Sequence, residues 1–305
     1  MIIRILAWKL RLLARLYLWR YRPVIIAITG SVGKTTTKEA VTAVLRTRYT
    51  VRSTEGNLNN ELGVPLTVIG DFAEEYYRVG GTFGFWALVF WRGFVGLFFS
   101  RIPYPAILVL EFGADHPGDI ARLTAEYPPH LAVVTHVGDV PAHVEFYASP
   151  RAVAQEKAAI VGRLMPDDVA VLGCDDLSVL EMRSRTKGRE RTFGFSEGAD
   201  VRVTAFRTCL EGSRPLGIAF DLEVHGHSMP VMIGGALGSG LAQAAAAAVA
   251  VAGAMDISLV DAVQAIARMT PPAGRMRILE GIRNTTIIDD AYNASPVATR
   301  VAIDA

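Results

Sequence analysis

The stretch that decides the fold is residues 25–37, Ile25-Ile26-Ala27-Ile28-Thr29-Gly30-Ser31-Val32-Gly33-Lys34-Thr35-Thr36-Thr37. Its uninterrupted apolar start is typical of a buried parallel strand. The two glycines let the backbone turn tightly, so that N–H groups can point at a phosphate. A helix predicted from about residue 34 to 46 adds positive potential at its N-terminus. The stretch therefore predicts a strand, an anion-binding turn and a helix.

The glycine spacing in this turn is Gly-x-x-Gly-Lys-Thr, which is shorter than the standard phosphate-loop pattern because Ile28 stands where that pattern has a glycine. The strand before it and the helix after it strengthen the interpretation. Lys34 would reach the terminal phosphates, and Thr35 would offer its hydroxyl to Mg²⁺. The alternative is a tight turn with an exposed lysine. We predict a nucleotide site made by Gly30, Ser31, Val32, Gly33, Lys34, Thr35 and Thr36.

Composition limits the class of protein. The 305 residues suffice for one large or two modest domains, and 51% of them are hydrophobic. The net charge of +1 gives the chain no bulk attraction for nucleic acid, so no such partner is expected. Two cysteines are too few for a disulfide scaffold or a four-cysteine zinc site, and they suit a reducing cytoplasm. No signal peptide is evident, because no small-residue cleavage site follows the first apolar stretch.

Residues 1–22 form a predicted basic amphipathic helix without acidic residues, and Pro23 ends it. Four of its arginines, Arg4, Arg11, Arg15 and Arg22, share one narrow stripe, and leucines, Ile5 and Trp19 cover much of the remainder. Lys9 and Arg20 interrupt the apolar side. Such a helix can lie on an anionic membrane surface, but it carries too many charges to span a bilayer. The alternative is a helix packed on its own domain or on a partner, with solvated arginines.

Residues 83–99 are nearly all apolar, with Arg92 near the middle. Their length is borderline for a membrane span, and the central cation favours a buried or interfacial helix. Together with residues 1–22 they could form one membrane-facing patch. We therefore expect a cytoplasmic protein that has a peripheral contact with the inner face of the membrane through these two helices.

Further buried strands are predicted at 106–110 and 131–135, with others near 169–172 and 191–195. The first ends in Glu111, at the edge of a parallel sheet where ligands bind, and its carboxylate could hold Mg²⁺ or cap the next helix. The other candidate groups on these segments are His136 and His143, just past the second strand, and Lys157, on a helix predicted over about 150–164.

A polar loop at 55–65 carries Asn57, Asn59 and Asn60. These amides could face a polar ligand, or they could serve ordinary turn chemistry, which the sequence alone favours.

The second half changes character after residue 200. Segments at 201–208, 217–224 and 228–233 alternate like antiparallel strands, which predicts a small antiparallel sheet appended to the parallel core. Helices at about 238–253 and 258–268 follow, then a proline-rich break and a strand at 285–288. We predict a mostly parallel α/β sheet flanked by helices, in three regions: the helix 1–22, an ATP-binding domain 23–283 and the beginning of a C-terminal α/β domain at 284–305.

These motifs together resemble the Mur ligases of peptidoglycan synthesis, and among them the members that add a D-alanyl-D-alanine dipeptide. Any one motif is a weak signal, whereas six in the family's order are a strong one. The matching stretches are Thr29–Glu39, Gly56–Thr67, Leu110–Asp119, His143–Lys157, Pro272–Met276 and Ile288–Pro296.

The resemblance implies an ATP- and Mg²⁺-dependent amide-bond ligase. A carboxylate attacks the γ-phosphate of ATP to give an acyl phosphate, and an amine then displaces phosphate. Such chemistry depends on positioning and charge neutralisation. The implied substrates are a UDP-MurNAc-peptide and D-alanyl-D-alanine.

The resemblance also implies catalytic roles for Lys34, Glu111, His143 and Lys157. Thr35 and Glu111 would bind one Mg²⁺, and His143 would help to bind a second. Lys157 matches the lysine that several members carbamylate, which turns a cation into a metal-binding carboxylate. The remaining implied contacts are Asn57, Asn59 and Asn60 with the nucleotide-sugar peptide, and Gln243, Arg275 and Asp290 with the nucleotide.

The chain departs from the family pattern in four ways. The uridine-gripping N-terminal domain is replaced by the basic helix, and the C-terminal domain stops soon after it starts, so we expect this chain not to complete ligation alone. The alanine-rich helix lacks the usual His and Asn near adenine and offers only Gln243. His136 stands where an asparagine is common, and two extra residues separate it from His143.

Two alternative functions remain open. One is the same chemistry with another acceptor, such as an amino-acid polymer, a folate or a lipid-linked substrate. The lipid-linked type usually has a four-cysteine zinc ribbon, which two cysteines cannot build. The other is a degenerate, membrane-associated scaffold that binds nucleotide or nothing, and the retained Lys34, Glu111, His143 and Lys157 oppose it.

Overall fold

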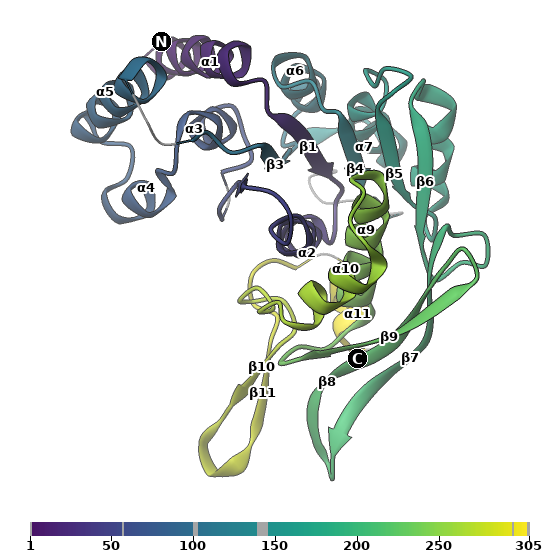
Figure 1. The fold of residues 1–305 in the computed structure, drawn as a ribbon. Coiled ribbons are helices and arrows are strands. Elements are labelled where there is room, and N and C mark those ends of the chain that lie inside the picture. Colours follow the sequence, from purple (N-terminus) through teal and green to yellow (C-terminus); the bar gives the residue numbers. More distant parts are fainter. Residues whose placement is uncertain (1, 57, 100–102, 139–145, 295, 304–305) are drawn as a thin grey trace.

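The architecture is a single large sheet with helices on both faces (Figure 1). The computed structural model describes residues 2–56, 58–99, 103–138, 146–294 and 296–303. The sheet has nine strands in the order β2-β3-β1-β4-β5-β6-β7-β8-β9. They are β1 (Val24–Thr29), β2 (Val51–Ser53), β3 (Ile107–Glu111), β4 (Leu131–Val134), β5 (Val169–Gly173), β6 (Arg189–Gly194), β7 (Val201–Glu211), β8 (Arg214–Val224) and β9 (His227–Gly234).

The pairing of neighbouring strands changes once across this sheet, from parallel to antiparallel. All pairs from β2 to β7 are parallel, whereas β7–β8 and β8–β9 are antiparallel. The antiparallel strands predicted after residue 200 therefore continue the main sheet. A separate two-stranded antiparallel sheet is formed by β10 (Arg277–Glu280) and β11 (Thr286–Asp289). The predicted class, a mostly parallel sheet with an antiparallel addition, is confirmed.

The apolar run of β1 is explained by burial on both faces of the sheet. Successive side chains of a strand point to opposite faces. Ile26 and Ile28 belong to the core cluster on one face, while Ile25 and Ala27 belong to the cluster on the other. The two clusters cover both faces of β1, so neither face meets water, and an alternating polar pattern would have been destabilising.

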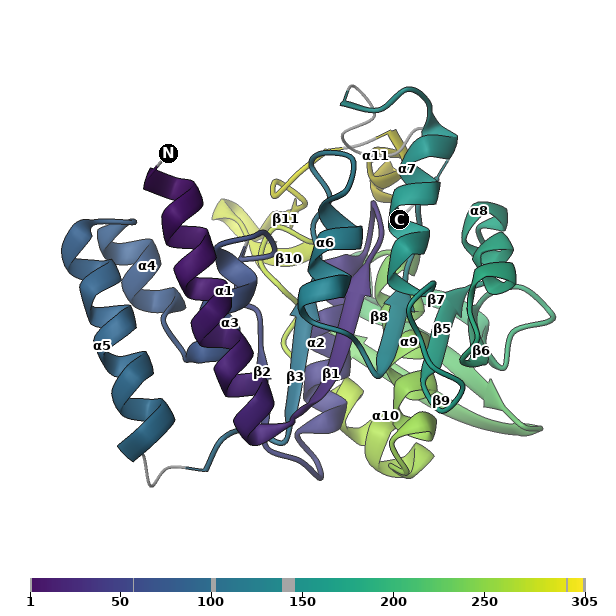
Figure 2. The ribbon, with the colours of Figure 1, turned by 90° about the horizontal axis from the view of Figure 1, so that it is seen from above.

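Helices cover both faces (Figure 2). The cluster that holds Ile26 is completed by α2, α9 and α10, and the cluster that holds Ile25 by α1, α3, α5 and α6. The α-helices are α1 (Ile2–Tyr21), α2 (Lys34–Leu45), α3 (Gly63–Ile69), α4 (Ala73–Val79), α5 (Phe83–Phe99), α6 (Asp119–Glu126), α7 (Pro150–Lys157), α8 (Leu177–Leu180), α9 (Ser239–Ala254), α10 (Leu259–Ala267) and α11 (Pro296–Ile303), with 3₁₀ turns at Ala158–Ile160, Glu181–Arg185 and Ile282–Asn284.

The two apolar helices predicted near the N-terminus are both present. The helix expected over 83–99 is α5, Phe83–Phe99, and α1 occupies most of residues 1–22. In the described part of the chain, no helix combines the length and apolarity that a membrane crossing requires. One face of α1 is packed on its own domain, because Ala7, Leu10 and Ala14 are almost fully buried.

The end of the chain forms the β10–β11 hairpin, which projects from the sheet (Figure 1). It is anchored by backbone hydrogen bonds from Leu237 to Met276 and from Ile278 to Gly235. The two paired strands lie on either side of residues 283–284, where the sequence suggests a domain boundary. That boundary stays a prediction.

Candidate active site

The phosphate loop connects the carboxyl end of β1 to α2. A Cβ atom built on Gly30 would lie 1.9 Å from the Thr135 hydroxyl oxygen, so only glycine fits. Gly30 has a φ of 151° and Gly33 a φ of 86°, both unfavourable for residues with a side chain. The spacing Gly-x-x-Gly therefore has a steric cause: the loop passes close to the end of β4 and then turns sharply into α2.

The backbone of this loop is held from the β4 side. The His136 carbonyl accepts hydrogen bonds from Ser31 N at 2.7 Å and Val32 N at 3.2 Å. The Thr135 hydroxyl donates to the Val32 carbonyl at 2.7 Å. The N–H groups of residues 34–36, in the first turn of α2, have no acceptor within the helix. They lie at the positive end of the helix dipole, an arrangement that favours an anion.

Glu111 lies beside this loop at the end of β3. The Thr35 hydroxyl donates to Glu111 Oε2 at 3.1 Å, and the Asn59 amide donates to Oε1 at 3.1 Å. The glutamate is 3% exposed, and its backbone N–H is bonded to the Thr54 hydroxyl at 3.0 Å. Parallel pairing of β1 with β3 places Ile28 opposite Glu111, which explains why the strand end and the loop meet.

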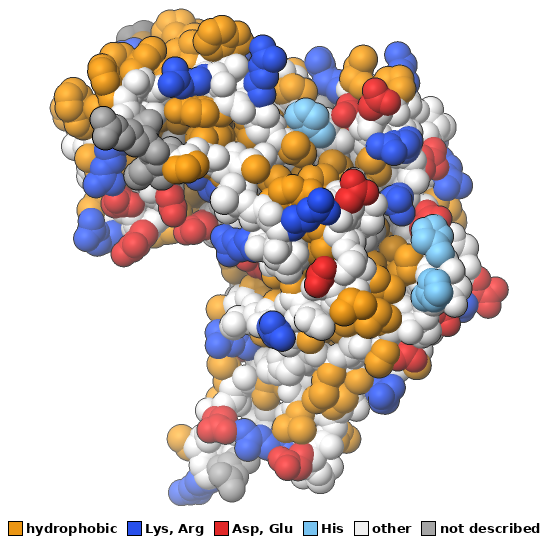
Figure 3. Space-filling model, viewed as in Figure 1, with side chains coloured by type: hydrophobic (Ala, Val, Ile, Leu, Met, Phe, Trp, Pro, Cys, Tyr) orange, Lys and Arg blue, Asp and Glu red, His pale blue; other side chains and the backbone are white. Residues whose placement is uncertain are grey.

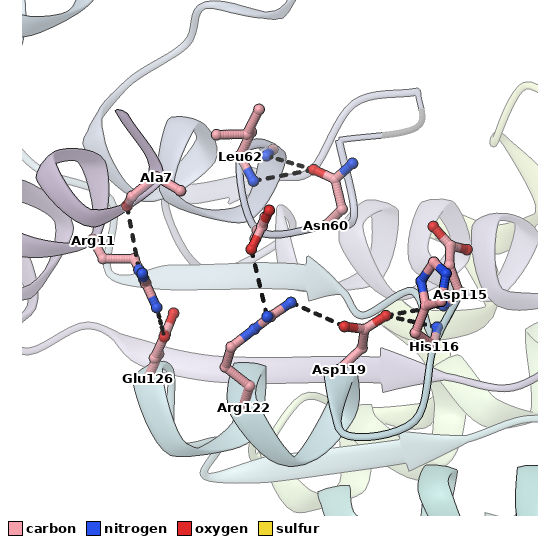
Figure 4. Close-up of polar contacts among 11 residues, drawn as sticks. Ala7, Arg11, Asn60, Leu62, Asp115, His116, Asp119, Arg122 and Glu126 are labelled. Carbon is pink, nitrogen blue, oxygen red and sulfur yellow. Dashed lines mark hydrogen bonds and ion pairs between the residues drawn. The ribbon is translucent and has the colours of Figure 1, made fainter. Parts of the chain in front are cut away.

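The neighbouring asparagine, Asn60, has a different local role. Its side-chain oxygen accepts hydrogen bonds from Leu62 N at 3.1 Å and Gly63 N at 3.0 Å, at the start of α3 (Figure 4). This is the turn chemistry that the sequence offered as an alternative. Asn57 and His143 lie outside the described residues.

Charged residues tie the asparagine loop to α6 (Figure 4). Arg122 lies 3.5 Å from Glu61 and 2.9 Å from Asp119. Asp119 Oδ2 in turn accepts hydrogen bonds from the N–H groups of Asp115 and His116. These contacts connect the loop that carries Asn59 to the segment after β3, and thereby help to fix Asn59 against Glu111.

The pKa values of two lysines at this site, Lys157 and Lys34, are lowered. Burial lowers the pKa of Lys157 to about 7, and the nearby positive charge of Lys34 adds to that effect. Lys157 is 4% exposed, at the end of α7. Burial also lowers the pKa of Lys34, although the Glu111 carboxylate opposes that shift. The Lys34 ammonium lies 3.3 Å from the Ser31 carbonyl, folded back on its own loop.

The oxygen atoms of this site fit a magnesium ion. Mg²⁺ prefers hard oxygen ligands and usually keeps several waters while it is held by one or two protein groups and substrate phosphates. The Thr35 hydroxyl and the Glu111 carboxylate are already within hydrogen-bond distance and could supply two such ligands. In the described ranges there is no cluster of three or more His, Cys, Asp or Glu side chains placed to hold a metal.

A cavity of about 220 Å³ opens beside the phosphate loop. Gly33 and Thr36 line one side, and Gln243, from the first turns of α9, lines another. The Gln243 amide donates to Asp175 Oδ2 at 2.8 Å. Burial acts to raise the pKa of Asp175, but hydrogen bonds from Phe195, Gln243 and Ser196 outweigh it and hold the pKa below its usual value.

Arg275 and Asp290 reach the same cavity from the C-terminal segment. The Arg275 guanidinium lies 4.0 Å from the centre of the Tyr292 ring, a cation–π contact. Asp290 Oδ1 accepts a hydrogen bond from Met276 N at 3.2 Å. The fold therefore brings Lys34, Gln243, Arg275 and Asp290 around the region next to the phosphate loop, although they are far apart in sequence.

Residues 28–76 and 99–252 match the Mur ligase middle domain. This chain belongs to the Mur ligase family. The match includes the phosphate loop, Asn59, Glu111 and Lys157. Residues 77–98, which include all of α5 except its last residue, lie between the two matched stretches.

Curated relatives of this chain are named as ligases of a UDP-N-acetylmuramoyl-tripeptide and D-alanyl-D-alanine. The UDP-N-acetylmuramoyl-tripeptide–D-alanyl-D-alanine ligase of Bacillus subtilis is 28% identical over 96% of this chain and 55% of its own length. The Mycobacterium bovis ligase of the same name is 32% identical over 92% of this chain and 48% of its own. This chain spans about half the length of these curated relatives.

Solved structures of MurF ligases are similar to this chain, and one of them is a complex with ADP. The MurF ligase of Thermotoga maritima, a complex with ADP, is 27% identical, with a TM-score of 0.78 over 98% of this chain and 60% of that one. MurF from Acinetobacter baumannii, 28% identical, has the same TM-score over 98% of this chain and 57% of that one. Both show that the order and packing of elements described above are those of Mur ligases.

Two carboxylates beside this cavity were not among the residues predicted from the sequence. Asp175 and Asp176 follow β5 after one intervening residue, Cys174, and both line the cavity. Asp176 accepts hydrogen bonds from Val137 N and Gly138 N, both at 2.8 Å, and lies 3.4 Å from His136 Nδ1. Their position just beyond a buried strand is the same signal that identified Glu111.

Proposed function

We propose that this chain provides the ATP-binding part of a Mur ligase that forms an amide bond by way of an acyl phosphate. The observation that carries the proposal is the contact of Thr35 with Glu111 next to the free N–H groups of the phosphate loop. It places a hydroxyl, a carboxylate and a lysine where the negative charge of a nucleoside triphosphate and its Mg²⁺ would have to be bound.

On the phosphate side, the N–H groups of residues 34–36 and the Lys34 ammonium would bind the β- and γ-phosphates. Thr35 and Glu111 would hold Mg²⁺, which when bound reduces the negative charge that an attacking carboxylate meets. Asn59 would keep the Glu111 carboxylate in place through the bond to Oε1. Lys34 has to leave the Ser31 carbonyl, at 3.3 Å, to reach a phosphate.

Lys157 would act as a carbamylated residue, as in several Mur ligases. Carbamylation requires the neutral amine, and a pKa of about 7 makes this form abundant at neutral pH. The product would be a carboxylate facing Lys34, which turns a repulsive pair into an attractive one. His143 would complete a second metal site.

The cavity lined by Gln243, Arg275 and Asp290 would receive the nucleoside, with Gln243 toward adenine and the other two toward phosphate and ribose. The structure of the Thermotoga maritima relative is a complex with ADP, which supports nucleotide binding as such. For the second substrate, we propose that Asn59 and Asn60, with Asn57, face a UDP-MurNAc-tripeptide.

The whole reaction would add D-alanyl-D-alanine to that tripeptide, as the names of the relatives suggest. We place this step in the cytoplasm, during peptidoglycan precursor synthesis. Residues 23–283 would form the ATP-binding domain and residues 284–305 the start of the next one. A peripheral contact of α1 and α5 with the membrane is a separate part of this proposal, and it does not depend on ligase activity.

The nucleotide site is tested by calorimetric titration of ATP–Mg²⁺ into the wild-type chain and the Lys34→Ala variant. Loss of charge-assisted phosphate contacts should weaken binding roughly ten- to hundred-fold. Lys187→Ala, at an exposed lysine remote from the cavity, is the matched control and should bind like wild type. Equal affinities for wild type and Lys34→Ala, or no binding by the wild type, would contradict the proposal.

A further inference from the structure

Helix α1 has two apolar faces on opposite sides. At about 100° per residue, the buried Ala7, Leu10, Ala14 and Tyr17 define the face that packs on the domain. A second stripe, on the opposite side, points to solvent. Its members are Ile5 (48% exposed), Trp8 (57%), Leu12 (49%), Leu16 (42%) and Trp19 (74%).

Helix α5 repeats this arrangement. Phe85, Val89, Gly93 and Leu97 are buried, and the opposite side of the helix is again apolar and exposed. Large apolar residues on the outside of a soluble helix are unusual when they are contiguous, and they mark interaction sites. Those of α5 are Phe83 (90% exposed), Trp91 (68%), Phe94 (52%) and Phe98 (52%).

The two helices form one layer at the edge of the molecule (Figure 2). The Tyr17 hydroxyl donates to the Gly93 carbonyl at 2.7 Å, and the Tyr21 hydroxyl to the Gly96 carbonyl at 3.2 Å. A Cβ on Gly96 would lie 2.5 Å from the Tyr17 hydroxyl, so glycine permits this close approach. Hydrophobic side chains gather over this corner of the surface (Figure 3). We call the exposed stripes of α1 and α5 together the α1–α5 face.

Cations flank the apolar stripe of α1 on both sides. Arg4 and Arg15 lie along one edge, and Lys9 and Arg20 along the other. No ion pair links any of these four to another described residue. The chain has no acidic residue before Glu39, so nothing on α1 offsets this charge.

We propose that the α1–α5 face binds the surface of an anionic lipid bilayer. The pattern is that of an interfacial helix, with an apolar stripe for the acyl boundary and basic edges for anionic headgroups. Trp8 and Trp19 are about three turns apart on this stripe, roughly 16 Å, and tryptophan favours the headgroup level. Neither helix is suited to cross the bilayer, so both lie along it.

The fold leaves the nucleotide cavity free in such a complex. None of the described residues that line the cavity belongs to α1 or α5. Strand β1 begins three residues after α1 ends and runs back alongside that helix (Figure 2). The exposed stripes lie on the sides of α1 and α5 that face away from the buried core, so a bilayer there would not cover the cavity.

Vesicle flotation of the 305-residue chain tests the proposal. We expect the wild type to float with vesicles of phosphatidylcholine and phosphatidylglycerol at 7:3, and much less with phosphatidylcholine alone. Leu12→Gln/Trp19→Gln removes exposed apolar side chains and should lower partitioning at least tenfold. Arg15→Gln/Arg20→Gln should lower it about thirty-fold on anionic vesicles and hardly at all on neutral ones.

The matched control is Leu177→Gln/Ile282→Gln, at residues that are 77% and 84% exposed elsewhere on the surface. It should float like wild type, and all variants should retain the wild-type circular dichroism and ATP affinity. No flotation of the wild type, or equal flotation of Leu12→Gln/Trp19→Gln, would overturn the proposal. A lipid-free dimer that this variant abolishes, without wild-type flotation, would assign the face to a second copy instead. Because flotation needs no nucleotide, its failure leaves the ligase proposal standing.

Discussion

Replacement of Lys157 by methionine should stabilise the folded chain, although Lys157 lies in the candidate active site. The side chain is 4% exposed, and burial beside the Lys34 charge lowers its pKa from 10.5 to about 7. At about 1.4 kcal/mol per tenfold change in proton affinity, a protonated Lys157 costs the folded state up to roughly 5 kcal/mol. Methionine has a similar length and no charge, so Lys157→Met should recover a few kcal/mol of this cost.

The pH dependence distinguishes this explanation from ordinary repacking. Below pH 7 Lys157 is protonated in both the folded and the unfolded chain, so the wild type bears the full cost. As pH rises above 7 the folded state releases its proton, whereas the unfolded state keeps it until about 10.5. Unfolding then involves proton uptake, and wild-type stability rises with pH. The advantage of Lys157→Met should therefore shrink by about 2–3 kcal/mol between pH 6 and pH 9.

The measurement is urea unfolding of both chains at pH 6, 7.5 and 9, in buffers free of CO₂ so that the amine stays unmodified. The free energies of unfolding in the absence of urea are compared, provided that the free energy falls with urea concentration at the same slope for both chains. Lys187→Met, at an exposed lysine, is the control and should show no pH-dependent difference. A stability difference for Lys157→Met that does not change with pH, or that grows as pH rises, would refute the reasoning.

Two further predictions concern packing. Gly30→Ala should lower the free energy of unfolding, measured by thermal denaturation, by more than about 3 kcal/mol, because its Cβ would lie 1.9 Å from the Thr135 hydroxyl. Gly212→Ala, at a positive φ with open space around it, is the control and should lower it by only about 1 kcal/mol. Equal losses for the two variants would argue against the clash. Tyr17→Phe should lower stability by about 1 kcal/mol, since its buried hydroxyl donates to Gly93 O at 2.7 Å, and an unchanged melting temperature would show that this bond between α1 and α5 contributes little.

Buried strands were the most predictable part of this fold. The apolar runs of β1, β3, β4 and β5 indicate strands because each is covered on both faces and cannot alternate with polar residues. The three-residue β2 and the four-residue β10 were not predicted, because a short segment carries too little periodicity and is recognised only through its pairing partner.

The candidate site was partly predictable for a topological reason. Carboxyl ends of neighbouring parallel strands meet at one edge, so the carboxylate at the end of β3 and the phosphate loop after β1 had to be neighbours. The contact between Gln243 and Asp175 joins residues 68 positions apart, and no local pattern indicates it. The altered pKa of Lys157 depends on burial and on Lys34, which are properties of the folded chain.

Sequence by itself determined the parallel core, the phosphate loop and the family, because backbone geometry and burial restrict which residues can occupy those positions. Only the tertiary structure decided which apolar side of α1 is buried. Its apolar residues surround much of the helix, so periodicity cannot separate an inner from an outer face. Packing against α3 and α5 buries Leu10 and Tyr17 and leaves Trp8 and Trp19 in solvent, because one helix can face its domain on only one side.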